Sequence, residues 1–131
     1  MKLEKSGNVL VASTDETVLW SGSAVGNYTA QLSEPKSNFE KIEIWHTWNP
    51  SVSGGPYIST YGSNFERVGC FGAGCTTAGS LYEFLTVFSA NSTALTILSA
   101  GQGAGTAGLN DINDAYKCLL RVVGINRTAE A

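Results

Sequence analysis

Apolar and polar residues alternate with a period of two along most of this chain, and no segment carries a sustained 3.6-residue pattern. Such alternation indicates β-strands, whose successive side chains point to opposite faces. The clearest example is residues 39–48, FEKIEIWHTW. One face of this segment carries Ile42, Ile44 and His46, and the other carries Lys41, Glu43 and Trp45. The pattern predicts a strand with one buried and one solvated face.

We expect the other strands to lie beside residues 17–32, TVLWSGSAVGNYTAQL. This stretch predicts an apolar strand that ends at Trp20, a small-residue turn or bulge over residues 21–27, and a returning strand over residues 28–32. Strict alternation places Val18 and Trp20 on one face of the first strand and Leu19 on the other. We expect this pair of strands to begin the core.

Further strands are predicted at residues 8–13, 57–61, 65–71, 81–89, 93–99 and 116–126. The best hairpin signal is Asn91-Ser92, whereas residues 100–108 and 110–114 are expected to be a glycine loop and a polar turn. About eight to ten short strands joined by Gly, Ser and Asn turns predict an all-β fold, namely an antiparallel, jelly-roll-like β-sandwich. Residues 8–131 are expected to form this single domain, and the polar residues 1–7 a flexible N-terminal arm.

Composition narrows the classes of function. Only 15% of the 131 residues are charged and 43% are hydrophobic, so we expect another copy of the chain to cover some apolar surface. The net charge is −3 and no Lys/Arg cluster occurs, which argues against a nucleic-acid partner. No apolar run approaches the roughly 20 residues that span a bilayer, and residues 9–12 are too short a run for a signal peptide. Membrane insertion and secretion are therefore not expected.

The chain has three cysteines and one histidine. Synthesis in the cytoplasm favours free thiols, with Cys118 buried as a small hydrophobe, although Cys70 and Cys75 are close enough in sequence to pair across a loop. A multi-histidine metal site is excluded. His46 with Cys70 and Cys75 offers at most a weak three-ligand zinc site. No metal ion is expected.

Two other motifs are weak signals. Residues 103–108, GAGTAG, match a dinucleotide-binding pattern, but no helix follows to hold a pyrophosphate, so we expect no cofactor. Residues 110–114, NDIND, carry oxygen ligands without the spacing of a calcium-binding loop, and turn chemistry explains them better. A hydrolase that uses His46 with a carboxylate stays a remote alternative, since no nucleophile elbow is present.

Aromatic residues flank the glycine-rich loop at residues 49–56. They are Trp45, Trp48, Tyr57 and Tyr61. Aromatic faces next to a loop can stack on sugar rings, and these four are the candidate ligand-binding residues. The competing interpretation is that Trp45 and Tyr57 cover sheet faces or a subunit contact.

Three segments together resemble the C-terminal β-sandwich modules of tailed-bacteriophage fibre and virion appendage proteins. They are VLWSGSA at residues 18–24, LSEPKSNFEKIEI at residues 32–44 and YKCLLRVVGINR at residues 116–127. They are similar to patterns of the form VLW-x-G, LS-x-P-x-S-N-F/Y and K-x-x-GI-x-R. Residues 49–80 match no part of the pattern, and a specific ligand preference is expected to lie there. We expect the first and last of these segments to pair nearby in one sheet.

The resemblance implies a non-enzymatic structural or receptor-binding protein. Such a protein is usually a homotrimer, is made in the host cytoplasm and is displayed on the virion beside other virion proteins. It would be a tail-fibre tip, head fibre or decoration protein, and its loops would contact a host-surface polysaccharide. The alternative is a stand-alone carbohydrate-binding, lectin-like domain.

Overall fold

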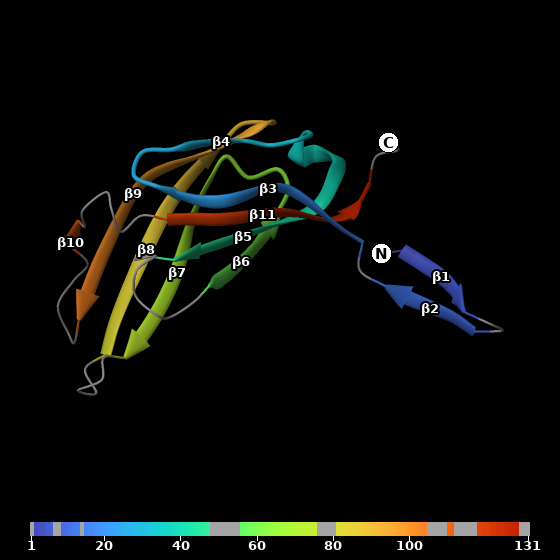
Figure 1. Cartoon of the computed structure of the whole chain (residues 1–131), viewed down its shortest axis with the longest axis horizontal. Coiled ribbons are helices and arrows are strands. Elements are labelled where there is room, and N and C mark those ends of the chain that lie inside the picture. The colour runs from blue at the N-terminus through green and yellow to red at the C-terminus, as the bar shows by residue number, and fades with distance from the viewer. Residues whose placement is uncertain are drawn as a thin grey trace.

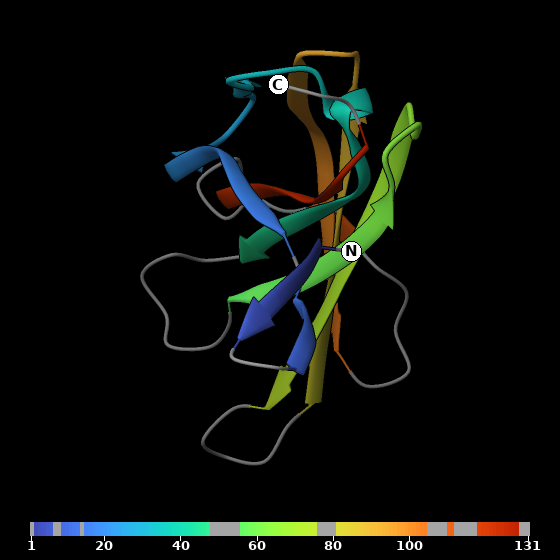
Figure 2. The ribbon, with the colours of Figure 1, turned by 90° about the vertical axis from the view of Figure 1, so that its right-hand side faces the viewer.

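The computed structural model describes residues 2–6, 9–13, 15–47, 56–75, 81–104, 110–111 and 118–128, with side chains placed in 15–47, 56–73, 85–98 and 118–128. These residues form eleven strands and one 3-10 turn, η1 (Lys36–Asn38). The predicted all-β fold is confirmed. Two antiparallel sheets lie face to face, as expected for a β-sandwich, and their strands are inclined to each other (Figures 1 and 2).

The first sheet has the order β3-β11-β5-β6. Its strands are β3 (Glu16–Val25), β11 (Cys118–Arg127), β5 (Phe39–Thr47) and β6 (Tyr57–Gly62). The second sheet has the order β10-β9-β8-β7, and β4 also pairs with β9. Its strands are β4 (Thr29–Gln31), β7 (Arg67–Cys75), β8 (Leu81–Ala90), β9 (Ala94–Ala104) and β10 (Asn110–Asp111).

The core lies between the two sheets. Its buried residues are Leu19, Ala30, Leu32, Phe39, Ile42, Ile44, Cys70, Phe88, Leu95, Ile97, Leu119 and Val122. On β5 the buried positions Ile42, Ile44 and His46 alternate with more exposed ones, as the sequence predicts. The β8–β9 hairpin around Asn91 is also confirmed, because Ala90 pairs with Leu95. Burial of one face of each sheet is the main source of stability in such a fold.

The stretch at residues 17–32 differs from its prediction in two respects. Strand β3 does not end at Trp20 but continues to Val25, since β11 offers pairing partners as far as Cys118. The returning strand β4 does not pair with β3; it crosses to the second sheet and pairs with β9. The expected pairing of the first and last motif segments is confirmed, because β3 and β11 are neighbours in one sheet.

The alternation predicted for the start of β3 is also wrong. A register shift pairs Val18 with Val123 and Trp20 with Val122, which leaves Leu19 as an extra residue on β3. An extra residue of this kind interrupts the alternation of side chains. Leu19 is consequently 2% exposed and Trp20 packs against the same core, while Val18 is 51% exposed.

Strands β9 and β7 also differ from their predicted boundaries. In both cases the neighbouring strand β8 offers pairing partners beyond the predicted end. Strand β9 runs to Ala104, into the predicted glycine loop, because β8 pairs with it as far as Tyr82. The sequence pattern predicts a strand at residues 65–71, whereas β7 spans Arg67–Cys75 along the other side of β8.

The geometry of the strands decides whether the cysteines can form a disulfide. Cys70 and Cys75 are five residues apart on β7, so their Cα atoms are roughly 16 Å apart. A disulfide needs Cα atoms less than about 7 Å apart. Cys70 and Cys118 are both free and buried, which confirms the prediction of free thiols at these two positions.

The N-terminal residues form a separate two-stranded hairpin of β1 (Lys2–Ser6) and β2 (Val9–Ser13). Figure 1 shows this hairpin beside the sandwich and outside both of its sheets. Residues 2–6 are thus a paired strand. The boundary predicted between an arm and a domain at residue 8 falls between two strands that pair with each other.

Gly124 on β11 provides a test of the packing between β11 and Phe39, the first residue of β5. A Cβ atom added there would lie 2.5–2.6 Å from three atoms of the Phe39 ring, which is 1% exposed. Gly124→Ala is therefore expected to lower the free energy of unfolding by about 2 kcal/mol, measured by urea denaturation. Gly62→Ala is the matched control, because its Cβ would meet only Asn64 Oδ1, at 3.6 Å. Equal stability of the two variants would contradict this account of the Phe39 contact.

Candidate functional site

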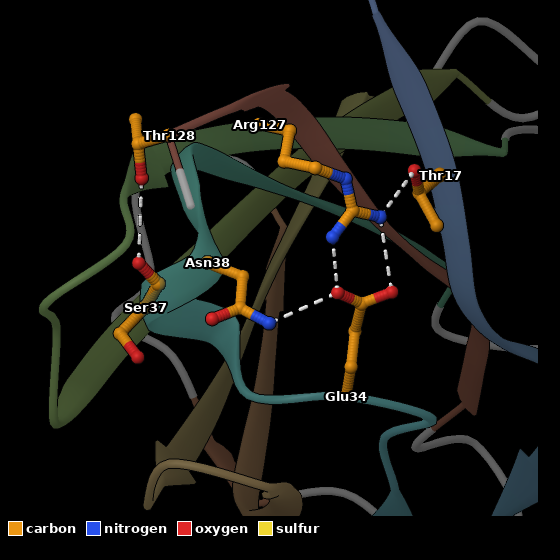
Figure 3. A network of polar contacts seen from close by, with 6 residues as sticks. All are labelled: Thr17, Glu34, Ser37, Asn38, Arg127 and Thr128. Carbon is orange, nitrogen blue, oxygen red and sulfur yellow. Dashed lines mark hydrogen bonds and ion pairs between the residues drawn. The ribbon is translucent and has the colours of Figure 1, made fainter. Parts of the chain in front are cut away.

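A network of polar contacts joins the end of β11 to the turn before β5 (Figure 3). Arg127 donates two hydrogen bonds to the Glu34 carboxylate, Nη1 to Oε1 at 2.5 Å and Nη2 to Oε2 at 3.1 Å. Its Nη2 also lies 3.4 Å from Thr17 Oγ1 on β3. A bidentate contact of this kind is directional and charge-assisted, so it fixes the position of the strand end.

Neighbouring groups extend the network. Asn38 donates from Nδ2 to Glu34 Oε1 at 3.0 Å, and the Asn38 carbonyl accepts the backbone N–H of Thr128 at 2.8 Å. The Arg127 guanidinium lies over the Phe39 ring, 4.8 Å from its centroid. These hydrogen bonds lower the pKa of Glu34 to about 2, chiefly through Arg127 and then Asn38. A carboxylate held ionised by an arginine and an amide is suited to fastening the chain and unsuited to proton transfer.

The four aromatic candidates do not form one surface. On β5, Trp45 lies on the outer face, where its indole donates to Glu43 and the Arg121 guanidinium stacks on it at 4.9 Å. Tyr57 and Tyr61 on β6 pair with His46 and Ile42, both of which face the core. Since paired residues in a sheet share a face, Trp45 is on the side opposite to the two tyrosines. Trp48 is outside the described residues.

The two tyrosines connect the sheets at one side of the sandwich. Tyr57 donates from its hydroxyl to the carbonyl of Ala73 at 3.2 Å, and Tyr61 donates to that of Gly69 at 2.6 Å. Both acceptors are on β7, the neighbouring strand of the second sheet. Burial raises the pKa of Tyr61 to about 12. These contacts give the tyrosines a part in closing the edge between β6 and β7, which the aromatic pattern alone did not reveal.

His46 is fully buried between the sheets, on the face of β5 that it shares with Ile42 and Ile44. Its Nε2 lies 3.2 Å from Ser59 Oγ, and the Tyr57 and Phe88 rings pack around it. Burial lowers its pKa to about 4, so the imidazole is neutral at pH 7. A substrate in solution does not reach this ring, which disfavours a hydrolytic role for it.

The described side chains include no group of three or more His, Cys, Asp or Glu residues that could hold a metal ion. Burial raises the pKa of the Cys70 thiol to about 11 and also raises that of Cys118. Neither is the thiolate that metal binding or nucleophilic attack requires. The side chain of Cys75, and Asn113 and Asp114 of the NDIND segment, are outside the described residues.

The burial of Lys36 is not indicated by the sequence pattern. Lys36, within a segment that predicts only a polar turn, is 7% exposed and lines a hollow of about 470 Å³ at one end of the sandwich. Its ammonium donates to the Ser63 carbonyl at 2.7 Å and lies 5.1 Å from the centre of the Phe65 ring. A lysine in a polar turn is normally solvated, so no sequence signal marks this burial.

Comparison with models of known protein families and with curated protein sequences finds no match to this chain. The resemblance to phage appendage modules therefore stays a prediction that rests on its three motif segments. Within the parts of the chain that the structure describes, no helix is long and apolar enough to cross a membrane.

The Glu34 contact predicts a specific loss of stability in acid. Because the pKa of Glu34 is lowered in the folded state, the unfolded chain takes up the proton first, and stability falls as the pH drops from about 4.5 to about 2. Glu34→Gln is expected to lower the urea midpoint at pH 7, with the difference from the unaltered protein shrinking to zero near pH 2. Glu16→Gln, at an exposed position of β3, serves as the control. Parallel pH profiles for Glu34→Gln and the unaltered protein would rule out this role.

His46 predicts a second, separate pH window. Its pKa is about 4 in the folded protein, against an ordinary value of 6.5, so the unfolded chain binds a proton more readily between these values. Stability is then full above pH 6.5 and falls by up to about 3 kcal/mol as the pH approaches 4. His46→Gln should remove this slope, whatever its effect at pH 7. Urea denaturation at a series of pH values checks this, and a slope that survives in the variant would contradict it.

Proposed function

We propose that this chain is a non-enzymatic structural module of a bacteriophage virion, serving as a tail-fibre tip, head fibre or decoration protein. It assembles as a homotrimer, is displayed on the particle beside other virion proteins, and contacts a host-surface glycan.

This proposal rests on the contacts that the residues of the three motif segments make in the fold. Glu34 from the second segment binds Arg127 from the third, and Phe39 packs on Gly124 across the same two segments. In the first segment, a Cβ at Gly22 would lie 3.1 Å from the Trp20 ring, so the glycine leaves room for the indole. The residues of the resemblance thus hold the fold together, which supports a shared structural module.

Exposed apolar residues on both outer faces support assembly with further copies. On the second sheet, Phe71 is 52% exposed next to the partly exposed Leu85 and Val87. On the first sheet, Ile58 is 50% exposed beside its pairing partner Trp45, and Val18 is similarly exposed. A cyclic trimer joins two different patches of neighbouring subunits, whereas a two-fold dimer needs only one patch. Two patches on opposite faces fit the first arrangement.

A stand-alone lectin-like domain is the second candidate. The hollow at Lys36 favours it, because hydroxyl and amide groups of its lining can bind a sugar without any assembly. The two candidates differ in oligomeric state.

Sedimentation of the full chain separates them. The proposal expects a trimer, and Ile58→Ser and Phe71→Ser should each weaken it at least about tenfold, the effect of losing about 1.4 kcal/mol of interface free energy. Asn64→Ala is the control, because Asn64 is an exposed residue of the turn after β6 and lies on neither outer face. A monomer at all concentrations would reject the trimer, and a dimer sensitive to only one of the two substitutions would reject a heterologous contact.

A further inference from the structure

Three turns meet around the hollow at the Lys36 end of the sandwich. They are the turn that contains η1, the turn between β6 and β7, and the turn between β8 and β9. The lining residues are Lys36, Ser37, Ser63, Asn64, Glu66, Ala90, Asn91 and Ser92. Its volume of about 470 Å³ is within the range of sites that hold small molecules.

The hollow has a fixed frame. The backbone N–H of Lys36 donates to the Ser92 carbonyl, and that of Ala90 donates to the Glu66 carbonyl, both at 2.8 Å. The Lys36 ammonium ties the first turn to the second through Ser63 O. Each turn is thus joined to another by a hydrogen bond. A ligand therefore does not have to order these turns, which lowers the entropic cost of binding.

The ammonium group of Lys36 is the main indication that the hollow binds a ligand. An ammonium group has three N–H donors, and the described residues provide one oxygen acceptor, Ser63 O, together with the face of Phe65. Lys36 is 7% exposed, and a donor in such a position gains free energy from each further acceptor that it finds. Removal from water also lowers its pKa. An oxygen-rich ligand in the hollow would supply the missing acceptors.

The other lining groups define the class of ligand. Ser37, Ser63 and Ser92 bring hydroxyls that both donate and accept, and Asn64 and Asn91 bring amides. Asn91 Oδ1 accepts the N–H of Thr93 at 2.9 Å, which leaves its NH₂ group to donate elsewhere. The single carboxylate, Glu66, balances the single ammonium, Lys36. The lining residues are therefore close to neutral in total charge and bring groups of both hydrogen-bonding kinds, while carbon makes up most of the exposed wall between them.

Other ligand classes fit less well. A phosphate or other anion would face the Glu66 carboxylate, and a divalent cation would face the Lys36 ammonium with only one carboxylate to bind it. An apolar ligand would cover the hydroxyl, amide and charged groups of the lining without giving them hydrogen-bond partners. Uncharged hydroxyl groups on a ring match the lining best. We infer that this three-turn hollow binds a neutral saccharide residue.

This inference rests on the glycan-binding part of the proposed function and moves the contact away from two of the aromatic candidates, Trp45 and Tyr57. Tyr57 pairs with His46 near the far end of β5, whereas Gly62, directly before the hollow, pairs with Lys41 near its start. The two locations are thus at opposite ends of the first sheet. Binding at one can be distinguished from binding at the other.

The test is a titration of the ¹⁵N-labelled full chain with glucose, galactose and N-acetylglucosamine at millimolar concentrations, followed by amide chemical shifts. At least one sugar should shift the amides of Ser63, Asn64, Asn91 and Ser92. Asn64→Ala and Glu66→Ala, both at exposed side chains, should weaken that sugar's affinity at least about tenfold, a loss of about 1.4 kcal/mol. Gln31→Ala, exposed on β4, is the matched control and should bind as the unaltered protein does.

Three results would overturn the inference. They are no shift with any of the three sugars, shifts centred on Trp45 and Tyr57, or shifts at the hollow with inorganic phosphate and none with the sugars. Sedimentation reports on the virion proposal independently. A trimer without sugar binding would reject the hollow as a saccharide site and leave the structural role standing, while sugar binding by a monomer would support the hollow and reject the trimer.

Discussion

The central position of the last strand is the constraint on which the rest of the structure depends. Strand β11 lies between β3 and β5, so the first sheet is incomplete until residues 118–127 are in place. Several contacts hold its end: Arg127 binds Glu34 with two hydrogen bonds, the N–H of Thr128 donates to the Asn38 carbonyl, and Gly124 leaves space for the Phe39 ring. The first half of the chain is thereby fastened to its end. Closing such long-range contacts is entropically unfavourable, and the buried core and this paired charge offset that loss.

The interior, the sides and the outer faces of the sandwich contain different kinds of side chains. The interior contains the free cysteines Cys70 and Cys118 and the neutral His46, none of which is in a state suited to chemistry at pH 7. The side between β6 and β7 is closed by two tyrosine hydroxyls that reach backbone carbonyls. Exposed apolar residues lie on the outer faces, and the hollow at Lys36 lies where three turns meet. In our proposal, the outer faces of this scaffold serve assembly and its turns serve recognition.

The turn before β5 belongs to the second motif segment and also lines the hollow. Glu34 and Asn38 in that turn bind the end of β11, while Lys36 between them points the other way, to Ser63 and the hollow. The contacts that hold the last strand therefore also set the position of the buried ammonium. In our proposal, the same turn serves the stability of a virion module and the shape of its saccharide site.

The sequence by itself determined the all-β class, the two faces of β5 and the hairpin at Asn91, because each depends on a local period of two or on turn residues. Only the tertiary structure decided where β3 and β4 go, since pairing with β11 and β9 is a long-range choice that local pattern does not encode. The same holds for the bulge that turns Leu19 inward and for the separation of Trp45 from Tyr57. The burial of Lys36 is the clearest case: its turn has the composition of a solvated one, and only the approach of two other turns removes the ammonium from water.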